Sequence, residues 1–184
     1  MSPLYMRVLG SSWTRIAPAV RQVHSTRSVI RLHGRLRIEG GGHRGARLLA
    51  WMLRLPRPDG AAYTRVTITA RDDGELWERT FNGRRLDTRQ YESGDGDLAE
   101  RFGVLEFRFH LEESGGSLLY TQRDASLLCG PARARIPASL APRVEAREDP
   151  AGPARITVRV RVAFPFVGPL LTYDGVIDVE DPPG

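Results

Sequence analysis

The sequence predicts a mainly β fold: a single antiparallel sheet of about eight or nine strands, strongly curled or closed into a barrel, with two short N-terminal helices. From Tyr63 onward, apolar and polar residues alternate with a period of two, and turn residues recur between the alternating segments. Charged residues alternate along most of these strands, which excludes a parallel sheet covered on both faces. Strands in hairpin order with few helices indicate a curled antiparallel sheet.

The first helical segment is expected over residues 4–24, where Leu4, Leu9, Trp13, Ile16 and Val20 can share one apolar face. Pro18 would interrupt or restart this helix. The segment is rich in Arg and Ser, and no acidic residue precedes Glu39, a composition that is also typical of a transit peptide. We favour a basic amphipathic helix that belongs to the domain. A strand over 29–39 and a short helix over 46–55 follow.

The other strands are predicted at 63–71, 75–81, 84–91, 104–112, 118–128, 156–164 and 170–179. Asp72-Asp73-Gly74 and Asn82-Gly83 are hairpin turns. Residues 104–112 alternate most clearly, with Leu105, Phe107, Phe109 and Leu111 facing one way and Glu106, Arg108, His110 and Glu112 the other. Residues 93–97 are expected to form a mobile loop. The Pro-rich stretch 131–153 is predicted as a long connection with one helical turn at 137–141.

Length and composition limit the class of protein. The 184 residues suit one domain, with a core over 4–179 and a tail over 180–184. No run approaches the roughly 18 apolar residues that a membrane helix needs, so no membrane span is expected. The net charge is +5, but every basic residue is Arg and acidic residues are interleaved with them, so we expect no nucleic-acid partner. The one cysteine, Cys129, excludes an internal disulfide and favours the cytoplasm.

The motif Gly40-x-Gly42-x-x-Gly45 has the spacing of a dinucleotide-binding turn. Its context argues against that role, because the preceding strand is highly charged and hairpins follow in place of further βα units. We expect no NAD or NADP binding and no other cofactor. A modest anion site at the start of the next helix, assisted by Arg44, stays open. The four histidines lack the spacing of metal ligands, and no catalytic motif is present.

The segment Trp77-Glu78-Arg79-Thr80-Phe81 carries the main candidate site. Strand alternation places Arg79 between two aromatic residues on one face of the sheet. If that face points inward, the buried guanidinium needs a carboxylate, which Glu100 or Glu106 could supply. Two interpretations stay open: a structural ion pair or stacked Arg, and a polar anchor in an apolar pocket for a ligand's carboxylate or phosphate.

The chain resembles the bacterial domain-of-unknown-function family 4166 over nearly its whole length. The motifs that carry the resemblance are Leu4-Tyr5, Leu9-Gly10, Pro18-Ala19-Val20-Arg21, His24, Gly34, Arg47-Leu48-Leu49, Leu55-Pro56, Trp77-x-Arg79-x-Phe81, Glu100-Arg101-Phe102-Gly103, Leu140 to Ala146, Pro165-x-Val167-Gly168 and Tyr173-x-Gly175. Residues 128–137 depart from the family's usual Gly-x-Pro-Leu-Pro. The resemblance implies no settled activity. Because similar domains occur alone or fused after saccharopine-dehydrogenase-like reductases, it suggests an accessory or ligand-holding domain beside redox metabolism.

We therefore expect a non-catalytic binding or accessory module with an apolar pocket for a small apolar or amphipathic ligand. The candidate ligand-binding residues are Trp77, Arg79, Phe81, Glu100, Glu106 and Tyr173. Two alternatives stay open: an enzyme that uses Glu and His on an inner strand face as acid and base, and a domain that docks a reductase-type partner. The enzyme requires Glu106, Arg108 and His110 to share a cavity with Arg79, whereas alternation points them away from Leu105.

Overall fold

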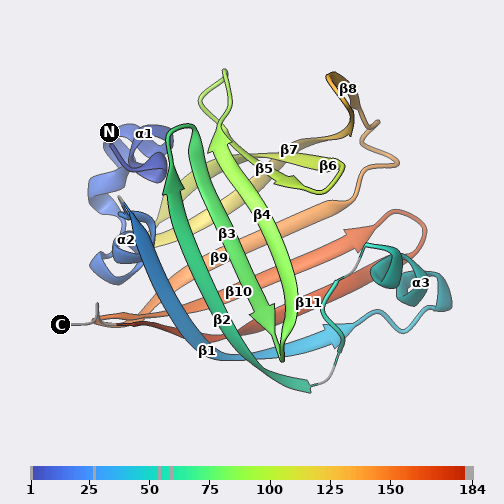
Figure 1. Cartoon of the computed structure of the whole chain (residues 1–184), viewed down its shortest axis with the longest axis horizontal. Coiled ribbons are helices and arrows are strands. Elements are labelled where there is room, and N and C mark those ends of the chain that lie inside the picture. Colours follow the sequence, from blue (N-terminus) through green and yellow to red (C-terminus); the bar gives the residue numbers. More distant parts are fainter. Residues whose placement is uncertain (1, 27, 54, 59, 181–184) are drawn as a thin grey trace.

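The computed structural model describes residues 2–26, 28–53, 55–58 and 60–180. Its strands form one antiparallel sheet in the order β6-β5-β4-β3-β2-β1-β11-β10-β9-β7-β8, and β6 also pairs with β7. Ten strands thereby close into a barrel, and β8 extends from β7 outside the ring (Figure 1). The mainly β, antiparallel fold predicted from the sequence is confirmed, and the sheet, expected to be either strongly curled or closed, is closed.

The strands, in chain order, have the following bounds: β1 (Val29–Gly40), β2 (Gly60–Arg71), β3 (Gly74–Phe81), β4 (Arg84–Glu92), β5 (Leu98–Phe102), β6 (Leu105–Ser114), β7 (Ser117–Cys129), β8 (Ala132–Arg135), β9 (Arg143–Gly152), β10 (Arg155–Phe164) and β11 (Gly168–Val179). Each ring neighbour is antiparallel to the next. Successive side chains along every strand therefore alternate between the barrel interior and its outer face.

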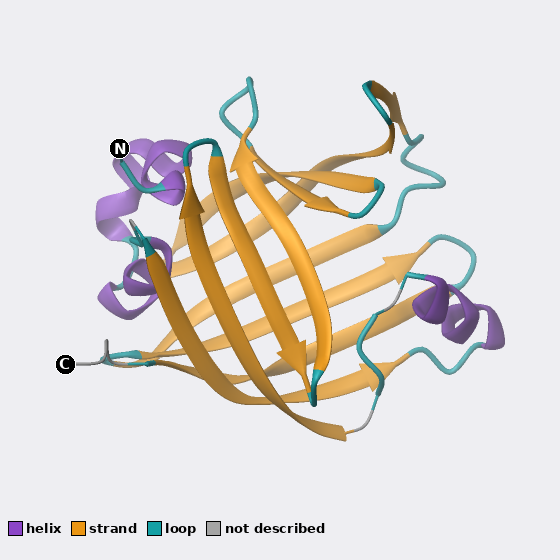
Figure 2. Cartoon of the chain, viewed as in Figure 1, coloured by secondary structure: helices purple, strands orange, loops and turns teal. Residues whose placement is uncertain are grey.

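Short helices lie at the two ends of the barrel (Figure 2). Helix α1 (Leu4–Leu9), the 3₁₀ helix η1 (Gly10–Arg15) and α2 (Pro18–His24) cover one end, which we call the plugged end. Helix α3 (Arg44–Met52) lies in the β1–β2 connection at the other end, which we call the mouth. Pro18 begins α2, as predicted, because the first helical residue has no intrahelical partner for an N–H.

The structure corrects the prediction for residues 131–153, which contain β8 and β9 instead of one long connection. Strand β9 was missed because its inward positions, Val144, Ala146 and Glu148, include a small and a charged residue. Pro150 also argued against a strand, but it lies beside a register shift between β9 and β10, where a missing N–H is tolerated. The helical turn predicted at 137–141 is present, since the Ala141 N–H donates to the Pro137 carbonyl at 2.9 Å.

Strand β5 was the third strand missed, which brings the described total to eleven instead of eight or nine. The hairpin predicted at Asn82-Gly83 is present, with φ angles of 47° and 82°. Both residues of such a turn need positive φ, which Asn and Gly adopt at low cost. Of the predicted tail at 180–184, residues 181–184 lie outside the described residues. In the described part of the chain, no helix has the length and apolar character needed to span a membrane.

The glycine motif lies between β1 and α3, where the sequence places it. Strand β1 pairs antiparallel with both β2 and β11, whereas a dinucleotide-binding unit requires parallel neighbours. The Gly41 N–H donates to the Leu170 carbonyl at 3.2 Å, so this turn is fixed against the start of β11. Its backbone geometry is thus accounted for by packing between the turn and the sheet.

Candidate ligand-binding cavity

A cavity of about 160 Å³ lies inside the barrel and is lined by side chains from all ten strands of the ring. A ring of eight strands leaves an interior that side chains can fill, and a ring of ten is wider. Most of the lining is aliphatic or aromatic. Its polar members are Thr64, Arg79, Thr88, Gln90, Glu100, Tyr120, Glu148 and Tyr173.

Arg79 projects into this cavity from β3, because inward positions on that strand alternate from Glu75 to Phe81. Its Nη1 donates to Thr88 Oγ1 at 2.7 Å, and its Nη2 donates to Glu100 Oε1 at 3.3 Å. The side chain is only 12% exposed. Burial is the largest influence and opposes the charged guanidinium, but the Glu100 carboxylate together with Tyr173 and Tyr5 outweighs it, so the pKa of Arg79 lies above its ordinary value.

The Trp77 ring lies against the Arg79 guanidinium, whose carbon is 4.7 Å from the ring centroid, within cation–π range. Further toward the mouth, the Phe81 and Tyr173 ring centroids are 5.5 Å apart. Burial raises the pKa of Tyr173 to about 12, so its phenol is neutral at physiological pH. Arg79 therefore lies in a mostly apolar, aromatic environment with one carboxylate partner.

The structure thus places five of the six predicted site residues together: Trp77, Arg79, Phe81, Glu100 and Tyr173 all line the cavity. Glu106 is not among the lining residues. It lies on the opposite face of β6, where it pairs with Arg133 of β8 and accepts a hydrogen bond from the Tyr91 hydroxyl.

The other two residues of the predicted titratable strip also point away from the cavity. Arg108 pairs with both carboxylate oxygens of Asp124, and its Nε lies 3.1 Å from Oδ1 and 3.0 Å from Oδ2. His110 is exposed, and its Nδ1 lies 3.3 Å from Asp97. The predicted alternation of β6 is therefore correct, because Leu105 and Phe107 line the cavity instead.

A hydrogen-bonded network closes the cavity at the plugged end. The Tyr5 hydroxyl of α1 donates to Gln90 Oε1 at 2.7 Å. The Tyr120 hydroxyl lies 3.1 Å from the Tyr5 oxygen and 3.0 Å from Glu148 Oε1, so its one proton can be donated to either. His24 Nε2 of α2 lies 2.6 Å from the other Glu148 oxygen. Burial strongly raises the pKa of both tyrosines, which stay protonated donors.

Two polar atoms beside this network have no hydrogen-bond partner among the described residues: His24 Nδ1 and Glu75 Oε1. The other Glu75 oxygen accepts from Trp77 Nε1 at 3.0 Å. Burial raises the pKa of Glu75, and His24 and Trp77 only partly counteract that effect. The plugged end thus contains a carboxylate whose charged form is destabilised by the fold.

Gln90, Tyr120 and Glu148 also line the cavity but were not predicted from the sequence. Glu148 belongs to the stretch taken for a connection, although the alternation Val144-x-Ala146-x-Glu148 was a usable signal. His24 was noted only as part of the resemblance. Its contact with Glu148 joins residues 124 positions apart, which local patterns do not reveal.

In the described part of the chain, no group of three or more His, Cys, Asp or Glu side chains could hold a metal ion. Comparison with models of protein families matches residues 16–177 to the domain of unknown function DUF4166. Neither the curated proteins nor the solved structures contain a match to the chain.

Proposed function

This chain belongs to the DUF4166 family, whose description names no activity, and from its barrel geometry we propose that it is a non-catalytic binding module for a small apolar or amphipathic molecule. The observation that carries the proposal is the cavity, with the Arg79–Glu100 pair among aromatic side chains. Binding sites of small molecules are typically concave and apolar, with a few polar groups that orient the ligand.

The cavity volume limits the ligand's size. A dry cavity of about 150 Å³ lined by aliphatic and aromatic side chains accepts benzene. The cavity of about 160 Å³ therefore suits one ring or a short chain as it stands. A longer molecule would extend past Leu86 and Val162 toward the mouth, where the lining is apolar.

The charges of the lining favour a neutral ligand. Arg79 is the one Lys, Arg or His among the described lining residues, and Glu100 and Glu148 supply two carboxylates. A carboxylate or phosphate would face both of them and compete with Glu100 for Arg79. A hydroxyl, carbonyl or amide could instead hydrogen-bond to the pair without adding a charge. We therefore propose a neutral polar group in place of the anion considered from sequence alone.

The placement of acidic and basic groups supports binding over acid–base catalysis. Glu106, Arg108 and His110 lie outside the cavity. His24 is fully buried behind its wall, with Nε2 engaged by Glu148. A general base must come within hydrogen-bond reach of its substrate. Glu148 lines the cavity but His24 does not, so a ligand in the cavity would not meet the His–Glu pair required for the enzyme alternative. For location we propose the cytoplasm, since the lone Cys129 fits a reducing compartment.

Native mass spectrometry of the protein purified from its host tests the proposal. We expect a small-molecule mass increment that disappears on denaturation. Ala146→Phe, which fills the cavity from β9, should lose this increment, whereas Ala61→Phe at an exposed position of β2 should keep it. A mass increment retained in Ala146→Phe would place the bound molecule elsewhere and contradict the proposal.

A further inference from the structure

Helix α3 at the mouth has apolar residues on two faces. Its inner face carries Ala46, Leu49, Ala50 and Leu53, at the i, i+3, i+4, i+7 spacing of a stripe that packs on the core. Leu53, just after the helix, also lines the cavity, as does Leu55. Packing against the barrel thus accounts for this inner face, but not for the residues on the other side of the helix.

The outer face of α3 presents a second apolar stripe to solvent. Leu48, Trp51 and Met52 are 58%, 71% and 62% exposed. Phe166, in the turn between β10 and β11, is 90% exposed. That turn lies beside α3, since a Cβ at Gly45 would be 3.6 Å from Val167. Large exposed apolar side chains gathered at one place mark an interaction site more often than scattered ones do.

Basic side chains flank this stripe. Arg44, Arg47, Arg57 and Arg84 are exposed, and none forms an ion pair with a residue that the structure describes. The sequence from Gly40 to Pro58 contains no acidic residue.

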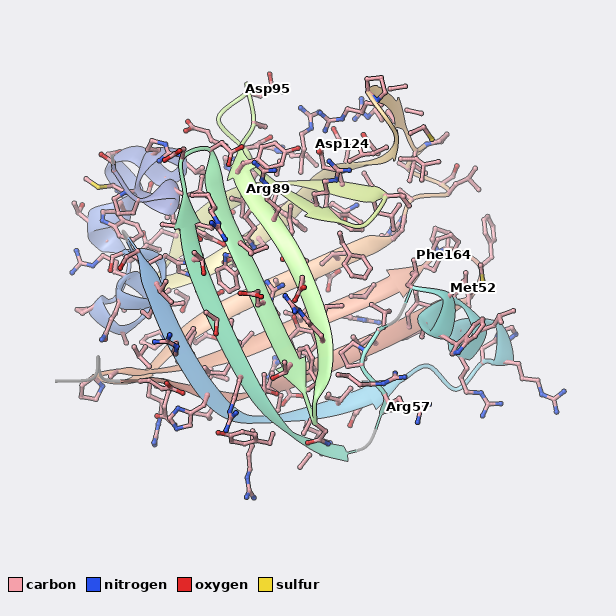
Figure 3. The ribbon with its side chains drawn as sticks, in the orientation of Figure 1. Met52, Arg57, Arg89, Asp95, Asp124 and Phe164 are labelled. Atoms are coloured by element: carbon pink, nitrogen blue, oxygen red, sulfur yellow. The ribbon has the colours of Figure 1, made fainter. Side chains whose placement is uncertain are left out.

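The β3–β4 turn brings Arg84 and Arg85 close to α3. Trp51 and Met52 line one shallow hollow with both arginines, and Arg84 Nη1 donates to the Leu55 carbonyl at 3.4 Å. Arg85 is balanced by Glu78 and Asp87, but Arg84 is not. Met52 and Arg57 both lie at the mouth, away from α1 and α2 (Figure 3).

We propose that the outer face of α3, together with Phe166, docks the protein on an anionic membrane surface. Trp, Phe, Leu and Met side chains with flanking Arg and no acidic residue have the composition that inserts at the lipid headgroup boundary. The negative potential of anionic lipids attracts such Arg residues. Because Leu53 and Leu55 line the cavity, the docked face lies next to the mouth, where an apolar molecule could pass between bilayer and barrel.

Docking does not depend on the ligand proposed above, so it can be tested on the protein alone. The full chain is sedimented with vesicles made of equal parts phosphatidylcholine and phosphatidylglycerol, and with vesicles of phosphatidylcholine alone. We expect sedimentation with the anionic vesicles that weakens as salt is added, because the attraction between exposed charges is screened. Equally strong binding to the vesicles of phosphatidylcholine alone would contradict the proposed attraction to an anionic surface.

Two variants with matched controls locate the surface. Glutamine is compatible with a helix, so Trp51→Gln/Met52→Gln should leave α3 folded. The variant should weaken vesicle binding about tenfold or more, because it removes the apolar area that inserts. Met6→Gln, at an exposed apolar position on α1 at the plugged end, should leave binding unchanged. Arg44→Gln/Arg47→Gln on α3 should reduce the salt-dependent part of vesicle binding. Arg31→Gln/Arg35→Gln on β1 lowers the net charge by the same amount but should leave this part unchanged.

The proposal is overturned if the wild type does not sediment with anionic vesicles, or if Met6→Gln loses as much binding as the α3 variant. A wild-type dimer in sedimentation equilibrium that Trp51→Gln/Met52→Gln dissociates, without vesicle binding, would also overturn it and assign the surface to a second copy. Failure of ligand binding alone leaves vesicle binding intact, so the two proposals can fail separately.

Discussion

The two ends of the barrel are closed in different ways. At the plugged end, α1 and α2 bury Tyr5 and His24 completely and fix them by hydrogen bonds to Gln90 and Glu148. At the mouth, Ala46 is the one fully buried residue of α3, and the side chains of α3 that face the barrel are apolar, with a long hydrogen bond from Arg84 to the Leu55 carbonyl beside them. Directional bonds hold one arrangement, whereas apolar contacts allow small displacements at low cost. We therefore propose the mouth as the route by which the proposed ligand enters and leaves.

The Arg79–Glu100 pair lies between the two ends. Its disruption should lower the free energy of unfolding more than any other change considered below. Arg79→Ala leaves Glu100 buried without its partner, and we expect the free energy of unfolding to fall by about 3–5 kcal/mol. Arg79→Lys should recover little of it, because an ammonium cannot make both hydrogen bonds and stack on Trp77. Chemical denaturation measures both losses.

The matched control is Arg15→Ala at the plugged end. Arg15 pairs with Glu113 on the surface, so the cost should be about 0–1 kcal/mol. A loss under about 0.5 kcal/mol for Arg79→Ala, the range of ordinary surface changes, would contradict the assignment of Arg79 to the interior.

Removal of a hydrogen bond at the plugged end should cause the next largest loss of stability. Tyr5→Phe removes a donor to Gln90 and leaves a buried acceptor unsatisfied, for a loss of about 1–3 kcal/mol. Tyr63→Phe, at an exposed tyrosine on β2, should change stability by less than about 0.5 kcal/mol. Equal losses in the two variants would remove the distinction between a fixed and an adaptable end.

The pH dependence of stability should distinguish Glu75 from other carboxylates. Burial raises the pKa of Glu75, so its contribution to stability is fully present below the unfolded value of about 4.3 and is lost as pH rises through the folded pKa. Glu75→Gln should therefore be more stable than the wild type at neutral pH, and the gain should vanish below about pH 4.

Glu113 provides a control of opposite sign. The Gly116 N–H and Arg15 lower the pKa of Glu113, so its contribution is present at neutral pH and is lost as pH falls through the folded value. Glu113→Gln should be destabilising at neutral pH and neutral in acid. Unfolding curves at several pH values compare the two variants, and a Glu75→Gln variant that loses stability at neutral pH contradicts the account.

The smallest effect is expected at the mouth. Trp51→Gln changes a side chain that packs on little else, so stability should change by less than about 0.5 kcal/mol. Hydrogen exchange should be faster in α3 than in α2, because α3 buries fewer side chains. Slower exchange in α3 than in α2 would show that the mouth is the more rigid end.

Local patterns were sufficient to predict the fold class and most strands. Alternation grouped the residues that share one face of β3 and of β6, without deciding which face of β3 points inward, and the Asn82-Gly83 dipeptide predicted a turn. Strands β5, β8 and β9 escaped detection because β5 and β8 are short and β9 mixes charged residues with Pro150. Strand β9 also pairs with β7, with Ala146 opposite Tyr120, and no local window contains that partner.

The part of the cavity site that lies on β3 was predicted from the sequence. Trp77, Arg79 and Phe81 share a face by spacing alone, and Glu100 was one of two carboxylates considered. The choice between Glu100 and Glu106 required the registers of β4, β5 and β6, which turn Glu100 inward and Glu106 outward. The Tyr5–Tyr120–Glu148–His24 network joins helices to distant strands, so only the three-dimensional structure reveals it.

The central claim, that the barrel interior binds a small molecule carrying a neutral polar group, is tested most directly by thermal unfolding with benzyl alcohol. This probe has one ring and one hydroxyl, and a molecule that binds only the folded state raises the unfolding midpoint. We predict a saturable rise for the wild type and Ala61→Phe, little or none for Ala146→Phe, and a smaller rise with benzoate. Equal rises in wild type and Ala146→Phe, or none in either, would contradict the claim.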